Sequence, residues 1–331
     1  MIKIVVDCFG GDRSPMVNVE GAILAVNKNP DIELILAGDE AKINEELKKY
    51  QYDKNRISIL DAKDVISCND TPTVAIRQMK ESSLVKSLEL LHSDESVKAL
   101  VSIGSTGAVL AGAVMKVGRI KGVKRPAFCP ILPTMNKSIV GVCDSGANVD
   151  CEPYYLQQFA LMGTLYMQKC YNIEKPRVAL LNIGTEEEKG DQLRKETYQL
   201  LKNSSSINFV GNMESRDLLS GNYDLVVCDG FSGNVLIKST EGTALELMKL
   251  LKKSFTSNLK NKIGALILKK SVYEIKDYMD YNNYGGGVML GVKKIIIKGH
   301  GSSKTNAIYN CIQQAYKKKK NQICQAIEAE I

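Results

Sequence analysis

Short runs of aliphatic and β-branched residues alternate along the chain with longer, helix-like stretches. The first run covers residues 2–6, passes through Gly10-Gly11, and leads to a helix-like stretch over residues 17–27. The same order of apolar run, glycine turn and helix recurs for apolar runs at residues 32–37, 99–103, 177–183 and 225–228. This repetition predicts an α/β fold whose mostly parallel sheet is covered by helices on both faces. Ligands of such folds bind beyond the carboxyl ends of the strands, where these glycine turns fall.

A basic segment in the last third of the chain departs from this rhythm. Apolar residues recur there at every fourth position, which makes one stripe on a helix. They are Leu251, Phe255, Leu259, Ile263 and Ile267. Lysines flank the stripe, Gly264 interrupts it, and residues 265–268 are apolar. We therefore expect a basic amphipathic helical hairpin over residues 240–281 with an apolar tip. The alternative is an ordinary helix packed on the core, with residues 266–268 buried.

The composition is that of a globular protein. The chain has 331 residues, of which 44% are hydrophobic and 24% are charged. We expect residues 1–331 to form a single large α/β domain, built as one body or as two intimate lobes. The first apolar run is too short for a signal peptide or a membrane span, so we expect a cytosolic protein. Nine scattered cysteines without a C-x-x-C pair indicate reduced thiols, and with two histidines we expect no metal site.

The net charge of +7 is unevenly distributed. Sixteen lysines and three acidic residues lie between Lys249 and Lys320, so the remainder of the chain carries a net charge of about −6. A basic final third on an otherwise acidic chain favours an anionic partner, such as an acidic protein, a lipid surface or nucleic acid. Solvated helix faces are the alternative interpretation.

Three turns are candidate sites for an anion. The turn Gly104-Ser105-Thr106-Gly107 opens a helix, where small residues let backbone N–H groups approach phosphate. Residues 182–190 place three glutamates and Lys189 beyond a predicted strand, and residues 229–234 place Asn234 in a glycine loop. Neither the P-loop pattern nor G-x-G-x-x-G occurs, which disfavours an ATPase or a standard dinucleotide-dependent enzyme.

Taken in order, these segments resemble the PlsX-type phosphate acyltransferases. The shared motifs lie at residues 6–12, 102–108, 119–123, 125–127, 144–150, 181–190, 208–212, 228–234 with 241–242, and 299–303. The resemblance implies transfer of a long-chain fatty acyl group from acyl carrier protein to inorganic phosphate, giving an acyl phosphate for phospholipid (phosphatidic acid) synthesis. It also implies a three-layer α/β/α sandwich, similar to phosphotransacetylases and isocitrate-type dehydrogenases, and a homodimer. We expect no cofactor.

Lys189 and Asn234 match the residues that the family associates with catalysis. Phosphate dianion is itself a nucleophile, so the enzyme must hold it beside the thioester and stabilise an oxyanion. We expect Lys189 to position phosphate and Asn234 to bind the acyl carbonyl or a phosphate oxygen. The candidate phosphate- and substrate-binding residues are Asp7, Gly10, Gly11, Asp12, Gly104, Ser105, Thr106, Gly107, Asn148, Gly184, Glu187, Gly233 and His300. For His300, in its Gly-His-Gly turn, a structural role is favoured over that of a general base.

The chain departs from the family pattern at a few of these positions. Cys8-Phe9 replaces alanine and methionine, and Arg13 stands where a histidine is common. Ser105 replaces an asparagine, so a specific contact by that amide would be lost or altered.

The resemblance also suggests partners for the basic final third. Acyl carrier protein is acidic, and the product must reach a membrane-bound glycerol-3-phosphate acyltransferase. We expect Leu266, Ile267 and Leu268 at the hairpin tip, with Lys269 and Lys270 beside them, to contact an anionic membrane, where each lysine contributes about 1 kcal/mol. The protein would then be cytoplasmic and peripherally attached to the inner face of the cell membrane. No nucleic-acid partner is expected, because the basic run near the C-terminus lacks a reading motif.

Other functions compete with this interpretation. A coenzyme A-dependent phosphotransacetylase acting on short acyl groups is the nearest. A decarboxylating dehydrogenase would need a nucleotide site and a metal-binding carboxylate cluster that the sequence does not assemble. A non-catalytic membrane scaffold would leave Lys189 and Asn234 without a role.

Overall fold

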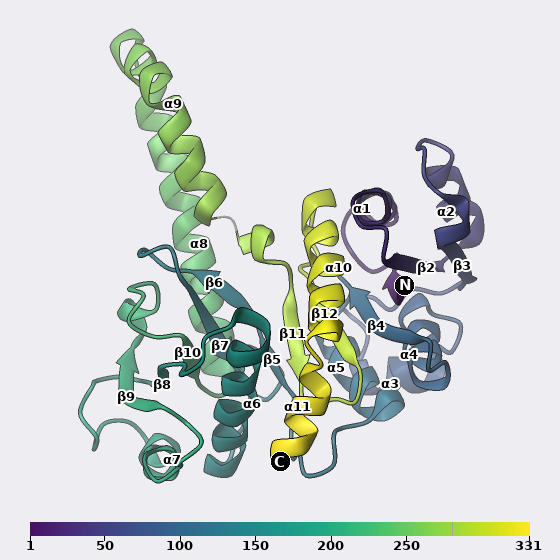
Figure 1. Ribbon diagram of the computed structural model, residues 1–331. Coiled ribbons are helices and arrows are strands. Elements are labelled where there is room, and N and C mark those ends of the chain that lie inside the picture. The colour runs from purple at the N-terminus through teal and green to yellow at the C-terminus, as the bar shows by residue number, and fades with distance from the viewer. Residues whose placement is uncertain (280) are drawn as a thin grey trace.

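The computed structural model describes residues 1–279 and 281–331, and its strands are divided between two sheets (Figure 1). The first sheet has the strand order β3-β2-β1-β4-β12-β11-β5. Its strands are β1 (Ile2–Asp7), β2 (Ile32–Gly38), β3 (Ile57–Asp61), β4 (Val97–Ser102), β5 (Ala127–Cys129), β11 (Gly287–Leu290) and β12 (Ile295–Lys298). All its pairings are parallel except the two made by β11.

The second sheet has the order β6-β7-β10-β8-β9 and is parallel apart from its edge strand β6. Its strands are β6 (Ile131–Pro133), β7 (Ile139–Cys143), β8 (Val178–Asn182), β9 (Phe209–Glu214) and β10 (Leu225–Val227). The predicted α/β class with mostly parallel strands is therefore confirmed, with the strands shared between two sheets.

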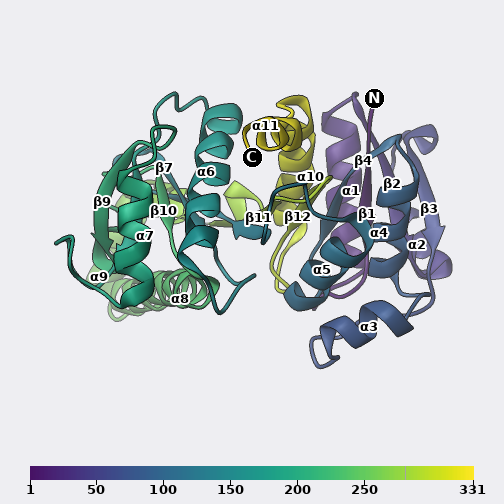
Figure 2. The same cartoon turned by 90° about the horizontal axis from the view of Figure 1, so that it is seen from below.

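Helices cover both faces of each sheet. They are α1 (Met16–Lys28), α2 (Glu40–Leu47), α3 (Pro72–Gln78), α4 (Ser83–Ser93), α5 (Thr106–Gly112), α6 (Pro153–Tyr171), α7 (Gln192–Lys202), α8 (Gly230–Phe255), α9 (Leu259–Met279), α10 (Thr305–Lys320) and α11 (Ile323–Glu330). Short helical turns occupy Lys54–Arg56, Ala113–Val117, Ser215–Asp217 and Tyr281–Tyr284. The C-terminal helices α10 and α11 lie between the two halves of the molecule (Figure 2).

The alternation of side chains along β1 shows how the layers are held together. Ile4 and Val6 belong to one apolar core, whereas Val5 belongs to the core on the opposite face, because successive side chains of a strand point to opposite sides. The core that contains Ile4 also contains Phe159 of α6 and Leu225 of β10. One continuous core therefore joins the two sheets and holds the carboxyl ends of their strands in a fixed relative position.

The hairpin is present, but its turn is not where the sequence pattern placed it. The polar residues between α8 and α9 form the tip: Thr256 Oγ1 donates to Lys252 O, and Asn258 Oδ1 caps α9 by accepting from Asn261 N at 2.9 Å. Gly264 lies inside α9 rather than at a break. The expectation that Leu266–Leu268 form the tip is therefore wrong, because a run of Thr, Ser and Asn ends the first helix and caps the second before this apolar stretch begins.

The hairpin protrudes from the molecule instead of packing along it (Figure 1). Its base is fixed by the buried side chains of Leu236 and Ile237 on α8 and by Tyr278 Oη, which donates to Thr134 O at 2.8 Å. Leu266 and Ile267 are 69% and 80% exposed, so the core-packed alternative is wrong. Across residues 1–279 and 281–331, every helix is too short or too polar to cross a membrane.

Candidate active site

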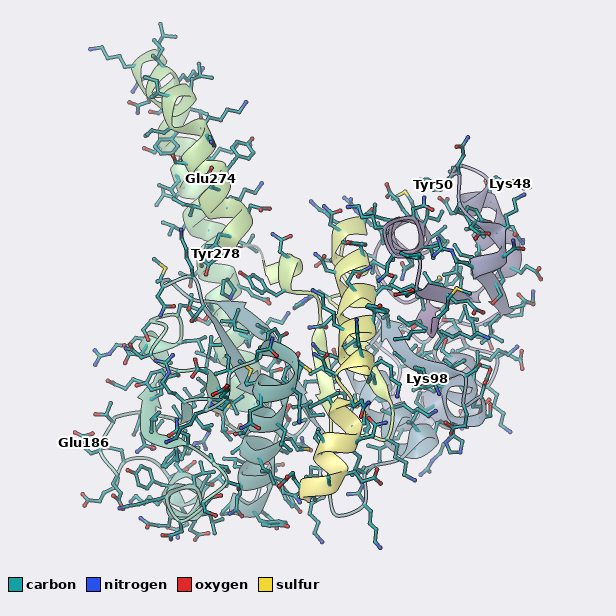
Figure 3. The ribbon with its side chains drawn as sticks, in the orientation of Figure 1. Lys48, Tyr50, Lys98, Glu186, Glu274 and Tyr278 are labelled. Carbon is teal, nitrogen blue, oxygen red and sulfur yellow. The ribbon has the colours of Figure 1, made fainter. Side chains whose placement is uncertain are left out.

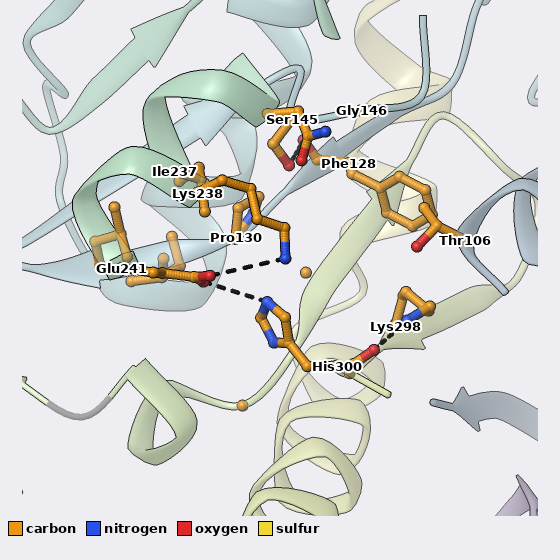
Figure 4. Close-up of a pocket in the computed structure, with 16 residues that line it drawn as sticks. Thr106, Phe128, Pro130, Ser145, Gly146, Ile237, Lys238, Glu241, Lys298 and His300 are labelled. Atoms are coloured by element: carbon orange, nitrogen blue, oxygen red, sulfur yellow. Dashed lines mark hydrogen bonds and ion pairs between the residues drawn. The ribbon is translucent and has the colours of Figure 1, made fainter. Parts of the chain in front are cut away.

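A cavity of about 290 Å³ opens where the two sheets meet at the carboxyl ends of their strands (Figure 4). The first sheet contributes Thr106 at the start of α5, with Lys298 and His300 at the end of β12. The second sheet contributes Ser145 from the loop after β7 and Asn234 from the first turn of α8. Segments distant in sequence therefore converge at the position expected for a ligand of a parallel sheet.

Three basic side chains and one carboxylate face this cavity. His300 Nε2 lies 3.2 Å from Glu241 Oε1, and Lys238 Nζ lies 3.9 Å from Glu241 Oε2 (Figure 4). Lys298 Nζ donates to the backbone carbonyl of Gly299. Burial lowers the pKa of Lys298 to about 8, so this lysine is still mostly protonated at neutral pH. The cavity carries more positive than negative charge and is suited to an anion.

Asp7 holds the glycine turn that follows β4 in the first sheet. Its carboxylate is buried and accepts from Ser83 Oγ at 2.6 Å and from Ser102 Oγ at 2.7 Å, and Ser102 Oγ in turn accepts from Gly104 N at 3.1 Å. Burial raises the pKa of Asp7 to about 6. The structure thus gives Asp7 a positioning role for the turn that carries Thr106, and its direct contact with substrate stays a prediction.

Asp144 holds the loop that follows β7 in the second sheet. Its buried carboxylate accepts from the backbone N–H groups of Phe128, Ser145, Ala147 and Asn148 at 2.7–3.2 Å. The side-chain amide of Asn148 donates to Asp144 Oδ2 and to Pro126 O. The predicted residue Asn148 therefore builds the loop, while Ser145 and Gly146 face the cavity.

Asn234 reaches the cavity because Gly233 lets α8 approach the loop closely. A Cβ on Gly233 would lie 1.9 Å from the backbone oxygen of Asp144, a distance that no side chain can occupy. Asp229 caps the helix by accepting from Ser232 N at 2.8 Å. The D-G-F-S-G-N segment therefore combines a helix cap, a close backbone approach and an amide side chain at the cavity wall.

The other predicted residues of the first sheet surround the cavity without all lining it. Gly10 packs against the backbone of Gly104, and Asp12 N donates to Gly301 O at 3.0 Å. Ser105 caps α5, and a Cβ on Gly107 would lie 2.7 Å from Pro72. A Cβ on Gly11 would collide with Ile103. These residues fix the shape of the turns without lining the cavity, whereas their neighbour Thr106 reaches it.

Lys189 lies in the loop after β8, at the same edge of the second sheet but outside the cavity lining. Its backbone carbonyl accepts from Asn182 Nδ2 at 3.0 Å, and its side chain is exposed. A Cβ on Gly184 would lie 3.0 Å from Lys189 Cγ. Figure 3 shows Glu186, in the same loop, at the outer edge of the molecule. Glu187 pairs with Lys202 at 2.8 Å, which turns its carboxylate toward α7. The catalytic role of Lys189 stays a prediction.

Among the polar side chains that face the cavity, sequence reasoning missed those of Lys298, Lys238, Glu241 and Ser145. Lys298 ends an otherwise aliphatic strand, and a charged residue at the carboxyl end of a parallel strand was the available signal. Lys238 and Ser145 carried weaker signals, since an exposed-looking lysine on a helix and a serine in a loop are common. Their importance depends on packing that a local pattern does not contain.

Comparison with known proteins assigns the family. A family model described as fatty acid synthesis protein matches residues 2–326. A phosphate acyltransferase of Clostridium acetobutylicum is 47% identical over 99% of this chain and 98% of its own length. One of Clostridium novyi is 48% identical over 100% of this chain and 98% of its own length. The chain belongs to the phosphate acyltransferase family. It is an acyltransferase, and the resemblance drawn from its motifs is confirmed.

The fold of this phosphate acyltransferase is shared with solved acyl-transfer enzymes. A phosphotransacetylase from Streptococcus pyogenes matches with a TM-score of 0.60 at 17% identity, covering 99% of this chain and 94% of its own. A branched-chain phosphotransacylase from Enterococcus faecalis matches with a TM-score of 0.59 at 14% identity, covering 96% of this chain and 98% of its own. The predicted similarity to the phosphotransacetylase fold is therefore confirmed.

The lining of the cavity in this acyltransferase combines polar and apolar groups. The basic groups and the amide of Asn234 are joined there by the apolar side chains of Phe128, Ile131 and Ile237. A polar anion and the apolar part of an acyl group can therefore lie side by side, as transfer between them requires.

Proposed function

We propose that this acyltransferase moves a long-chain fatty acyl group from the thioester of acyl carrier protein to inorganic phosphate. The observation that carries the proposal is a cavity whose lining combines Lys238, Lys298 and His300 with apolar side chains, in a chain of the phosphate acyltransferase family. The acyl phosphate would then supply phospholipid synthesis through a membrane-bound glycerol-3-phosphate acyltransferase.

The reaction needs little chemistry from the protein. Hydrogen phosphate, held by Lys298 and Lys238, attacks the carbonyl carbon of the thioester. A carbon–oxygen bond forms, the carbon–sulfur bond breaks, and the proton of hydrogen phosphate ends on the thiol of the carrier. The amide of Asn234 stabilises the oxyanion that forms between these events, and such a donor contributes about 3 kcal/mol to lowering the barrier.

The test is release of thiol from palmitoyl-acyl carrier protein with and without inorganic phosphate. We expect release that depends on phosphate and a product that reacts with hydroxylamine. The comparison substrate is acetyl coenzyme A. Faster turnover of acetyl coenzyme A than of palmitoyl-acyl carrier protein would support a short-chain phosphotransacetylase instead. Thiol release at the same rate with and without phosphate would exclude both the proposed activity and a phosphotransacetylase.

We also propose that the hairpin attaches the enzyme reversibly to an anionic membrane at the cytoplasmic face. Support comes from Ile267 and Leu268, which are exposed beside Lys269 and Lys270. These residues lie on the flank of the hairpin, so the contact would be made by its side rather than by its polar tip. Sedimentation with phosphatidylglycerol vesicles, and not with phosphatidylcholine vesicles, is expected. Binding that survives the Ile267→Ser and Leu268→Ser substitutions would contradict the assignment of this surface. The expected homodimer can be measured in the same samples by light scattering.

A further inference from the structure

An apolar groove of about 670 Å³ runs between the two helices of the hairpin. Its apolar lining includes Leu245, Met248 and Phe255 of α8 with Ala265 and Val272 of α9. Lysines stand around it, namely Lys249, Lys252, Lys262, Lys269 and Lys276. An apolar lining interspersed with lysines suits a hydrocarbon chain that is attached to an anionic group.

The face of α8 that forms this groove is the face that lines the cavity. Asn234, Lys238 and Glu241 line the cavity, and the next positions at the same spacing are Leu245 and Met248 in the groove. Positions three and four residues apart share one side of a helix, so the two linings form one continuous stripe. One helical turn separates the last cavity residue from the first groove residue.

The length of this stripe matches an acyl chain. A helix rises about 1.5 Å per residue, so Leu245 lies about 16 Å along α8 from Asn234, and Met248 about 21 Å. The chains of one lipid leaflet span half of a hydrocarbon core about 30 Å thick, which is about 15 Å. An acyl group whose carbonyl lies at Asn234 would therefore place its methyl end at the start of the groove.

We propose that α8 carries the acyl chain of the substrate, from the carbonyl at Asn234 to the methyl end in the groove at Leu245 and Met248. This acyl path rests on the proposed function. Glu241, at the junction, does not oppose it, because its carboxylate is held by an ion pair with Lys238 and lies 3.2 Å from His300 Nε2. Each buried methylene is worth about fourfold in binding, so the groove would make the enzyme selective for long chains.

The acyl path predicts a change of chain-length preference in Leu245→Trp. Leu245 is 55% exposed, so the larger side chain can be accommodated without unfolding, yet it would fill the start of the groove. We expect kcat/KM for palmitoyl-acyl carrier protein to fall about tenfold or more, from loss of two or more buried methylenes, while octanoyl-acyl carrier protein is used normally. Leu250→Trp is the matched control, because Leu250 is 63% exposed on the opposite side of α8.

A direct binding measurement makes the test independent of turnover. The chain contains no tryptophan, so Met248→Trp introduces a single fluorescent reporter near the expected methyl end. Palmitate brominated at its methyl end should quench this tryptophan and leave the tryptophan of Leu250→Trp unquenched.

The outcomes separate the acyl path from the proposed function. A wild-type enzyme without phosphate-dependent turnover of any acyl-acyl carrier protein would overturn both. Normal wild-type turnover, with an unchanged palmitoyl-to-octanoyl ratio in Leu245→Trp and no selective quenching, would overturn the acyl path alone. Leu245→Trp could instead leave that ratio unchanged and alter the mass of the protein in solution, which would show that a second copy covers the groove. It could also leave the ratio unchanged and alter binding to vesicles, which would show that lipid covers the groove. Either result would exclude the acyl path.

Discussion

Replacement of Lys298 is expected to weaken phosphate binding without weakening the fold. Burial at the end of β12 lowers the pKa of this lysine from 10.5 to about 8. A shift of that size corresponds to a free-energy penalty on the order of 3 kcal/mol for the charged form in the folded protein. Lys298→Met removes this penalty while retaining an unbranched chain, so the free energy of unfolding at neutral pH should not decrease.

The magnitude of the functional loss follows from the bond that phosphate would make. A hydrogen bond to a charged group contributes about 1.5–3 kcal/mol, so kcat/KM for phosphate should fall about 10- to 100-fold in Lys298→Met. In the wild type, the lysine loses its proton as the pH rises through about 8. Above that value kcat/KM for phosphate should therefore fall about tenfold per pH unit. Lys298→Arg stays charged, so its profile should lack this fall.

The assay is the initial rate of thiol release at varied phosphate concentration, on both sides of pH 8. Lys293→Met is the matched control, because Lys293 is exposed between β11 and β12 and lies outside the cavity. The reasoning would be refuted if the Lys293 and Lys298 variants behaved alike. It would equally fail if Lys298→Arg kept the alkaline fall of the wild type.

Three further sets of variants test other parts of the structure. Asn234→Ala should lower phosphate-dependent thiol release by about 10²–10³-fold, because an oxyanion donor is lost. Lys189→Ala should also lower this release, and both variants should keep the circular dichroism of the wild type. A rate near that of the wild type in either variant would refute the role assigned to the replaced residue. Gly233→Ala should destabilise the protein by about 3 kcal/mol in urea unfolding, because the new Cβ would lie 1.9 Å from the oxygen of Asp144, and unchanged stability would contradict that close approach. Lys318 is buried, which lowers its pKa to about 8, and its ammonium lies 4.5 Å from the centroid of the Tyr166 ring. Lys318→Met should raise the free energy of unfolding by about 1 kcal/mol at neutral pH, since a burial penalty of about 3 kcal/mol is partly offset by a cation–π contact of about 2 kcal/mol. Since the folded-state pKa is lowered, that gain should shrink as the pH rises above 8 and the buried lysine of the wild type becomes neutral; an equal gain at all pH values would refute it.

Local patterns in the sequence determined much of the fold and the family. Aliphatic runs predicted β1, β2, β4, β8 and β10 to within a few residues, because strand formation and its glycine turns depend on neighbouring residues. The same patterns placed the Ser102–Ala108 turn at a strand end. Residues 229–234 also follow a strand, but the expectation that they form a glycine loop is wrong, because Asp229 caps α8 and residues 230–234 form its first turn. The order of the motifs determined the family, and three of the candidate residues, Thr106, Asn234 and His300, line the cavity in the structure.

The position of the hairpin turn shows the limit of a periodic pattern. The apolar stripe continues from Leu251 across Phe255 and Leu259, so the period alone placed the turn too late. The side chains of Thr256 and Asn258 end one helix and cap the next, which is local chemistry that the sequence contained and that outweighed the pattern.

Only the tertiary structure decided which residues form the cavity. Lys298 reaches it because β12, near the end of the chain, inserts beside β4, and no local signal specifies that pairing. Asn234 reaches it because Gly233 lets α8 touch the loop at Asp144, whereas Lys189, one strand further along the second sheet, remains outside. The charge of the cavity and the lowered pKa of Lys298 arise from contacts between two sheets and from burial. Cavity charge and pKa depend on the whole packed core. The sequence therefore indicated the kind of reaction, whereas the tertiary structure determined which residues lie where that reaction would occur.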